Sequence, residues 1–226
     1  MSNFPGIHLS EADQDRLPGV LLLILALVKL SGLGFFGPLQ QPDSLAYLAY
    51  AHTILTQTNW LTDAGLQDFA VPQTVFRTFG YPALIAAAGK LTGDGGVALY
   101  LVVLVQFGFS LWATVMVYRL GQALLKNRNL ALLAAAGHAL SVTLTYDQHI
   151  LTDSLFNALC VIGFTVPVLG FVQGRRPGAV KLFGLGVVLA MACLVRGIGI
   201  YVLVFIAPAY IAWLVATRDE IVPALR

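Results

Sequence analysis

The chain has 226 residues, of which 11% are charged and 58% are hydrophobic. A soluble domain typically carries about 25% charged and about 45–50% apolar residues, so water is not the main solvent of this chain. The net charge of +2 is too small, and the cations are too scattered, for a nucleic-acid partner. These values predict a single integral membrane domain, residues 1–226, of the all-α class.

Apolar runs separated by polar joints predict a polytopic bundle of about six membrane-spanning helices. Residues 1–16 lack the positive charge of a secretory signal, so the first apolar run is expected to be retained after a cytoplasmic tail. The spans are expected at residues 17–38, 97–125, 130–145, 155–172, 182–195 and 197–216. The break between the last two is expected at Arg196-Gly197-Ile198-Gly199, because a membrane arginine seeks water and glycine permits a turn.

The positions of Lys and Arg predict the orientation, because cations near the ends of spans favour the cytoplasmic side. Cations follow the second, fourth and sixth spans, so both termini are expected in the cytoplasm. The opposite face then carries the long loop 39–96 and six acidic residues, which are Asp43, Asp63, Asp68, Asp94, Asp147 and Asp153. We therefore expect a multi-pass protein of a bacterial inner (plasma) membrane, with its active face on the non-cytoplasmic side.

The long loop, residues 39–96, contains signals for interfacial helices. Pro42 and Asp43 form a typical helix start, after which Asp43, Tyr47 and Tyr50 fall on one face. The other face is apolar, as in a helix that lies in the membrane interface. Two interpretations of Asp43 stay open, a helix cap and a functional carboxylate. A second apolar helix is expected over residues 83–91.

Two patterns in this loop resemble a known family. An acidic residue in an Asp-x-x-x-Tyr-x-x-x-Ala setting is followed by Arg-Thr-x-Gly-Tyr-Pro and an apolar helix. This order resembles the GT-C glycosyltransferases, particularly the protein O-mannosyltransferases and lipid A aminoarabinose transferases. The matching residues are Asp43, Tyr47, Ala51, Arg77, Gly80, Tyr81 and Pro82. Two later segments, Leu151-Thr152-Asp153-Ser154-Leu155-Phe156 and Leu194-Val195-Arg196-Gly197, are also similar, whereas Phe79 stands where the family commonly has proline.

The resemblance implies an inverting transfer of sugar from a polyprenyl-phosphate donor to a hydroxyl of a lipid, glycan or protein acceptor. By resemblance, Asp43 is the general base that takes the acceptor proton, and Asp153 is a second catalytic carboxylate. Arg77 and Arg196 are the candidates for stabilising the leaving phosphate, because an arginine fork binds phosphate through two hydrogen bonds. Tyr47 and Tyr81 complete the expected substrate-binding residues.

Further polar residues raise the question of a metal. Asp147, His149 and Asp153 are expected on the same face, and carboxylate and imidazole groups together can bind a divalent cation. Asp-x-His-x-x-x-Asp is not an established ligand spacing, so no metal site is predicted and the cofactor stays unknown. Lys29 lies well within the first span and must either snorkel or pair.

Other functions stay open beside the glycosyltransferase. A transporter or lipid flippase also uses charged residues in a membrane bundle, but it predicts an inverted repeat, and none is found. Members of the resembling family are usually longer, so this chain is expected to be an amino-terminal part, a reduced relative or a non-catalytic subunit. Weak or no turnover is accordingly expected from the chain without a partner subunit or a missing carboxy-terminal part. The other expected partners are membrane lipids.

Overall fold

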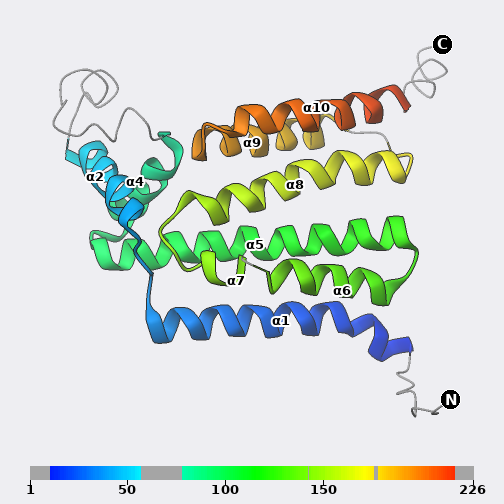
Figure 1. Ribbon diagram of the computed structural model, residues 1–226, viewed down its shortest axis with the longest axis horizontal. Coiled ribbons are helices and arrows are strands. Elements are labelled where there is room, and N and C mark those ends of the chain that lie inside the picture. Colours follow the sequence, from blue (N-terminus) through cyan, green and yellow to red (C-terminus); the bar gives the residue numbers. More distant parts are fainter. Residues whose placement is uncertain (1–10, 57–77, 142, 176–177, 217–226) are drawn as a thin grey trace.

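The computed structural model describes residues 11–56, 78–141, 143–175 and 178–216, and every regular element in these ranges is a helix (Figure 1). The helices are α1 (Glu11–Phe36), α2 (Pro42–Thr56), α4 (Gly80–Thr92), α5 (Gly95–Leu125), α6 (Arg128–Ala139), α7 (Thr143–Tyr146), α8 (Thr152–Val172), α9 (Ala179–Val195) and α10 (Gly199–Ala216). The prediction of an all-α class is confirmed.

The apolar helices have the lengths and surfaces of membrane helices. Among the described helices, three are long and apolar enough to cross a membrane, at Leu17–Phe36, Gly95–Leu125 and Thr152–Val172, while α9 and α10 are apolar but shorter. Large side chains such as Leu27 and Phe205 are more than half exposed on α1 and α10. Apolar surface of this extent is stable where lipid replaces water. The chain is therefore an integral membrane protein.

The bundle is organised around α5. Figure 1 shows α1 and α6 on one side of α5, and α8 followed by α9 and α10 on the other. The packing of α6 on α5 depends on small side chains, because Ala131, Ala135 and Ala139 recur every four residues and are all buried. A Cβ on Gly121 of α5 would lie 3.0 Å from the Cα of Ala131. Such small residues allow two membrane helices to approach closely.

The two ends of the bundle differ in their connections (Figure 1). At one end, which we call the loop end, α2 and α4 lie beside the starts of α5 and α8 and the turn between α9 and α10. At the other end, which we call the far end, lie the α5–α6 and α8–α9 turns with the cations Lys126, Arg128, Arg175 and Lys181. Chemistry at the loop end is therefore supported by two extra helices.

Some boundaries differ from the sequence-based expectation. The interval 130–145, expected as one helix, is divided, because α6 ends at Ala139 and the hydroxyl of Ser141 donates a hydrogen bond of 2.6 Å to the His138 carbonyl before α7 begins. Helix α8 begins at Thr152, which places Asp153 in its first turn and not in the preceding joint. Gly199 begins α10 where a Cβ would lie 2.9 Å from the Ala192 carbonyl group.

Candidate functional site

A short backbone pairing brings the first loop helix to the start of α8. The Leu39 N–H donates to the Gln148 carbonyl at 2.9 Å, and the Ile150 N–H donates to the Leu39 carbonyl, also at 2.9 Å. The chain thus leaves α1, pairs with the segment before α8, and begins α2 next to it. Asp43 and Asp153 consequently line one open hollow of ≈ 470 Å³.

A second hollow, of ≈ 620 Å³, shares Tyr146 and Asp153 with the first. Arg196 also lines it, and its guanidinium forms an ion pair with Asp153. The guanidinium carbon lies 5.9 Å from the ring centre of Phe156, which adds a cation–π contact. The Arg196 and Asp153 side chains are 45% and 40% exposed, so both remain accessible to a ligand. We call the two hollows together the carboxylate site.

Asp43 lies in the first turn of α2, where Gln41 and Ser44 on either side of it are joined by two hydrogen bonds. The Gln41 N–H donates to the Ser44 hydroxyl at 2.9 Å, and the Ser44 N–H donates to the Gln41 carbonyl at 2.8 Å. The positive end of the helix dipole favours a carboxylate at this position. Asp43 is an exposed residue and lines the hollow.

Tyr47 of α2 and Tyr81 of α4 join the loop helices to the bundle. Their ring centres are 5.3 Å apart in an edge-to-face arrangement. The Tyr47 hydroxyl lies 3.3 Å from the Thr152 hydroxyl, and the Tyr81 hydroxyl donates to Gln106 Oε1 at 2.6 Å. Burial, reinforced by the nearby Tyr47 and Asp153, raises the pKa of Tyr81 far above its usual range, so Tyr81 stays a protonated donor. Neither ring is among the residues that line the carboxylate site.

Tyr50 follows Asp43 and Tyr47 along the same helix, as the spacing predicts. Partial burial raises the pKa of its hydroxyl, which remains protonated near neutral pH. Like Tyr47, Tyr50 is not among the residues that line the two hollows. Among the three residues of this face, the carboxylate alone reaches the site.

Asp147 points away from the carboxylate site into the bundle. Its carboxylate forms an ion pair with Lys29 of α1 and accepts a hydrogen bond from the Ser154 hydroxyl. The Lys29 ammonium also donates to the Ser110 hydroxyl at 3.4 Å. The exposed fractions of the Lys29 and Asp147 side chains are 1% and 0%. A membrane lysine that cannot reach water is expected to pair in this way.

Gln106 of α5 connects this buried pair to the loop helices. Its side-chain amide donates to the carbonyls of Asp147 at 3.0 Å and His149 at 3.1 Å, while its oxygen accepts from Tyr81. The side-chain amide of Gln106 therefore holds the segment that leads to Asp153 against α5. The sequence analysis did not identify Gln106, although a glutamine within an apolar helix is itself a signal of buried hydrogen bonding.

The three residues considered for a metal do not converge. Asp147 is engaged with Lys29, and His149 Nδ1 lies 2.9 Å from the Thr145 carbonyl oxygen. In the parts of the chain that the structure describes, no three His, Cys, Asp or Glu side chains are placed to hold a metal ion. Asp147 is thereby fixed inside the bundle, whereas His149 itself lines the first hollow.

Arg77 lies outside the described residues, but the segment after it is fixed against α9. The Thr78 hydroxyl donates to the Val195 carbonyl at 2.7 Å. A Cβ on Gly80 would lie 2.6 Å from the carbonyl carbon and oxygen of Leu194, an approach that a side chain would prevent. The start of α4 is thereby attached to the chain immediately before Arg196.

The fold and the site together define a class, a membrane-embedded helical bundle with an open, charged site at one end. The sequence model of the family described as dolichyl-phosphate-mannose-protein mannosyltransferase matches residues 77–224. This match covers more than half of the chain, and the chain belongs to that family of GT-C membrane glycosyltransferases. Comparison with curated proteins and with solved structures gives no match.

The family match confirms the resemblance found in the sequence and covers part of the candidate site. The matched range contains Arg77, Tyr81, Asp153 and Arg196, whereas Asp43 and Tyr47 precede it. Membership supports a glycosyltransferase that uses a polyprenyl-phosphate sugar. The roles of the individual residues rest on their geometry.

Proposed function

We propose that this protein transfers a sugar from a polyprenyl phosphate to an acceptor hydroxyl at the loop end, on the non-cytoplasmic side of the membrane. The observation that carries the proposal is the sharing of one hollow by two exposed carboxylates, Asp43 and Asp153, with Arg196 paired to the second. Family membership provides the donor class, and the hollow provides a polar site beside lipid. The acceptor is a lipid, glycan or protein hydroxyl.

Asp43 is the proposed general base. As the acceptor oxygen bonds to the anomeric carbon, its proton passes to the Asp43 carboxylate. The bond between that carbon and the phosphate oxygen breaks on the opposite side, and the polyprenyl phosphate leaves with the electron pair. A single displacement of this kind inverts the anomeric configuration. Proton transfer to a positioned base contributes about 10²–10⁴ in rate.

Arg196 is the proposed contact for the leaving phosphate. Its guanidinium remains protonated and can form two hydrogen bonds to phosphate oxygens as negative charge develops there. Asp153 and Phe156 hold this side chain at the mouth of the hollow. Asp153 therefore acts by positioning Arg196 beside the donor, and Arg77 is the second candidate cation by resemblance.

The proposed sidedness follows from six crossings with both termini in the cytoplasm, in a bacterial inner membrane. Cysteine labelling in intact cells tests it, in a background where the native Cys160 and Cys193 are replaced by alanine. An impermeant maleimide should label Asp94→Cys at the loop end and spare Lys126→Cys at the far end. The reverse pattern would place the loop end in the cytoplasm.

Membranes from expressing cells provide the test of function, because they supply any partner subunit the chain needs. Polyprenyl phosphate carrying a radiolabelled sugar should lose label to an acceptor in these membranes. In membranes that contain the Asp43→Asn/Arg196→Gln variant at the same level, far less label should pass from the polyprenyl phosphate to the acceptor. Equal transfer in both would overturn the proposal. Movement of the intact labelled lipid across the membrane without release of sugar would instead indicate a flippase.

A further inference from the structure

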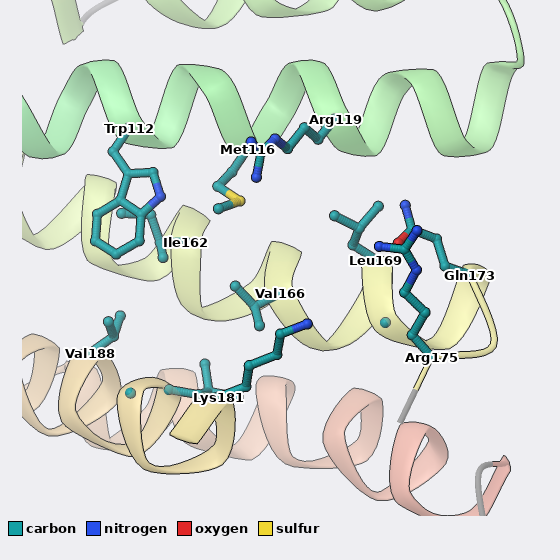
Figure 2. A pocket seen from close by; sticks show the side chains of 13 residues that line it. Trp112, Met116, Arg119, Ile162, Val166, Leu169, Gln173, Arg175, Lys181 and Val188 are labelled. Carbon is teal, nitrogen blue, oxygen red and sulfur yellow. The ribbon is translucent and has the colours of Figure 1, made fainter. Parts of the chain in front are cut away.

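A separate hollow lies between α5, α8 and α9, toward the far end of the bundle (Figure 2). Its volume of ≈ 350 Å³ is within the range of small-molecule sites. Three cations, Arg119, Arg175 and Lys181, line it together with apolar side chains such as Trp112 and Val188. It shares no lining residue with the carboxylate site.

Helical periodicity produces this arrangement. Each helix contributes one stripe at the i, i+4, i+7 spacing. The stripes are Trp112, Met116 and Arg119 on α5, Ile162, Val166 and Leu169 on α8, and Lys181, Leu185 and Val188 on α9. Since α5 ends and α9 begins at the far end, the charged members of these two stripes lie toward that end. The hollow is thus cationic at the membrane surface and apolar toward the membrane interior.

The lining of this hollow carries cations and no carboxylate, since none of its residues is acidic. Arg119 and Lys181 are exposed, and no hydrogen bond or ion pair joins either of them to another residue within the described ranges. Arg119 and Lys181 face the hollow from α5 and α9 (Figure 2), so an anion placed between them is attracted by both. Phosphate suits the position, because it accepts from an arginine fork and a lysine ammonium together.

We propose that this hollow binds one anionic phospholipid from the surrounding leaflet. The phosphate lies between Arg119 and Lys181, and an acyl chain follows the apolar stripes toward Trp112. Seven residues of α5 separate Arg119 from Trp112, which is roughly 10 Å along a helix. A zwitterionic lipid is disfavoured, because its own cation would lie among the three of the hollow. Basic pockets between membrane helices recognise anionic headgroups in this way.

A simpler explanation is that these cations only follow the general enrichment of Lys and Arg at cytoplasmic helix ends. In that case, every exposed cation of the far end would attract anionic lipid equally. Lys126 is the matched control, because it is an exposed cation at the same end but does not line the hollow. The proposal requires Arg119 and Lys181 to contribute more than Lys126 to the binding of anionic lipid.

Quenching of Trp112 by brominated lipids provides the test. Trp60 and Trp213 are replaced by phenylalanine, and the protein is reconstituted in phosphatidylcholine vesicles. At equal bromine content, brominated phosphatidylglycerol should quench Trp112 more strongly than brominated phosphatidylcholine. Arg119→Gln/Lys181→Gln should reduce the relative affinity for phosphatidylglycerol roughly tenfold or more, because charge-assisted hydrogen bonds are lost. Lys126→Gln should leave it unchanged.

Native mass spectrometry of the unmodified chain supplies an independent count of bound phosphatidylglycerol and does not depend on the tryptophan replacements. Equal quenching by the two lipids, with no retained phosphatidylglycerol, would overturn the proposal. An equal loss in Lys126→Gln would also do so and would favour the general attraction. Inorganic phosphate should not remove the phosphatidylglycerol preference beyond the effect of chloride at the same ionic strength. If it does, the site takes a soluble phosphate and not a lipid.

Discussion

Within the described residues, the ion pairs of Asp147 and Asp153 have carboxylates that are close in sequence but lie in opposite environments. Asp147 pairs with Lys29, and both side chains are almost completely buried. Asp153 pairs with Arg196, and both are close to half exposed. A buried charge is strongly unfavourable without its partner, whereas an exposed pair contributes about 0–1 kcal/mol and can exchange partners. An aspartate paired with a cation therefore forms a structural anchor in one place and an accessible site in the other.

The anchor supports the site. Lys29 on α1 holds the segment that follows α7, and the Ser154 hydroxyl ties the same carboxylate to the first turn of α8. Asp153 lies in that turn, next to Ser154. Positioning by buried hydrogen bonds keeps the exposed carboxylate in place without occupying it. The two pairs can be separated experimentally, because disruption of the first should affect stability and disruption of the second should affect ligand binding.

The largest expected effect on stability follows from disruption of the buried pair. Lys29→Met leaves the Asp147 carboxylate buried without its cation and should lower the free energy of unfolding by about 3–5 kcal/mol. Denaturant titration in detergent, followed by circular dichroism, measures this change. Lys90→Met removes an exposed cation and should have little effect. The double variant Lys29→Met/Asp147→Asn should regain part of the loss, and failure of Lys29→Met to destabilise would contradict the anchor.

Removal of a neutral hydrogen-bonding group from the same buried network should lower the free energy of unfolding by an intermediate amount. Tyr81→Phe removes the donor to Gln106 Oε1 and leaves that buried oxygen unsatisfied, which should cost about 1–3 kcal/mol. The same titration applies, with Tyr201→Phe on the exposed surface of α10 as the control. If Tyr81→Phe lowered the free energy of unfolding no more than the control, the hydrogen bond from Tyr81 to Gln106 would not contribute to stability.

The smallest expected change in stability belongs to the exposed pair. Arg196→Gln should change the free energy of unfolding by less than about 1 kcal/mol, because the pair is close to half exposed. Binding of polyprenyl phosphate should nevertheless weaken roughly tenfold or more as the charge-assisted hydrogen bonds are lost. Equilibrium binding of a labelled donor measures this, with Lys90→Gln as the loop-end control. Unchanged donor affinity would remove Arg196 from the site.

Much of the fold could be predicted because each membrane helix corresponds to a continuous apolar run in the sequence. The apolar run that contains Lys29 predicted a helix, and the charge within it was expected either to snorkel or to pair. The identity of that partner depends on how α1 lies against the segment between α7 and α8, so Asp147 could not be distinguished from other acidic residues. Helix α6 ends at Ala139 and α7 begins at Thr143, a division that the apolar pattern of residues 130–145 does not reveal.

The sequence offers candidate site residues but not their arrangement in space. Asp43 and Asp153 are far apart in sequence, and they share a hollow because the Leu39 backbone pairs with that of Gln148 and Ile150. Backbone hydrogen bonds of this kind have no side-chain signature. Tyr47 matched the resembling family, yet its burial against Tyr81 was invisible to spacing alone. Motifs therefore indicated which residues to examine, and tertiary packing decided which of them reach the hollow.

The most direct measurement compares Asp43→Asn with Asp94→Asn for sugar transfer and donor binding on the same membranes. Asp94 is a useful control, because its carboxylate caps α5 by accepting a 2.9 Å hydrogen bond from the Val97 N–H, and asparagine caps almost equally well. Asp43→Asn should lower the transfer rate about 10²–10⁴-fold with donor affinity unchanged, since only proton abstraction is lost. Asp94→Asn should leave both near the parental values. Transfer at the parental rate by Asp43→Asn would contradict the general-base assignment.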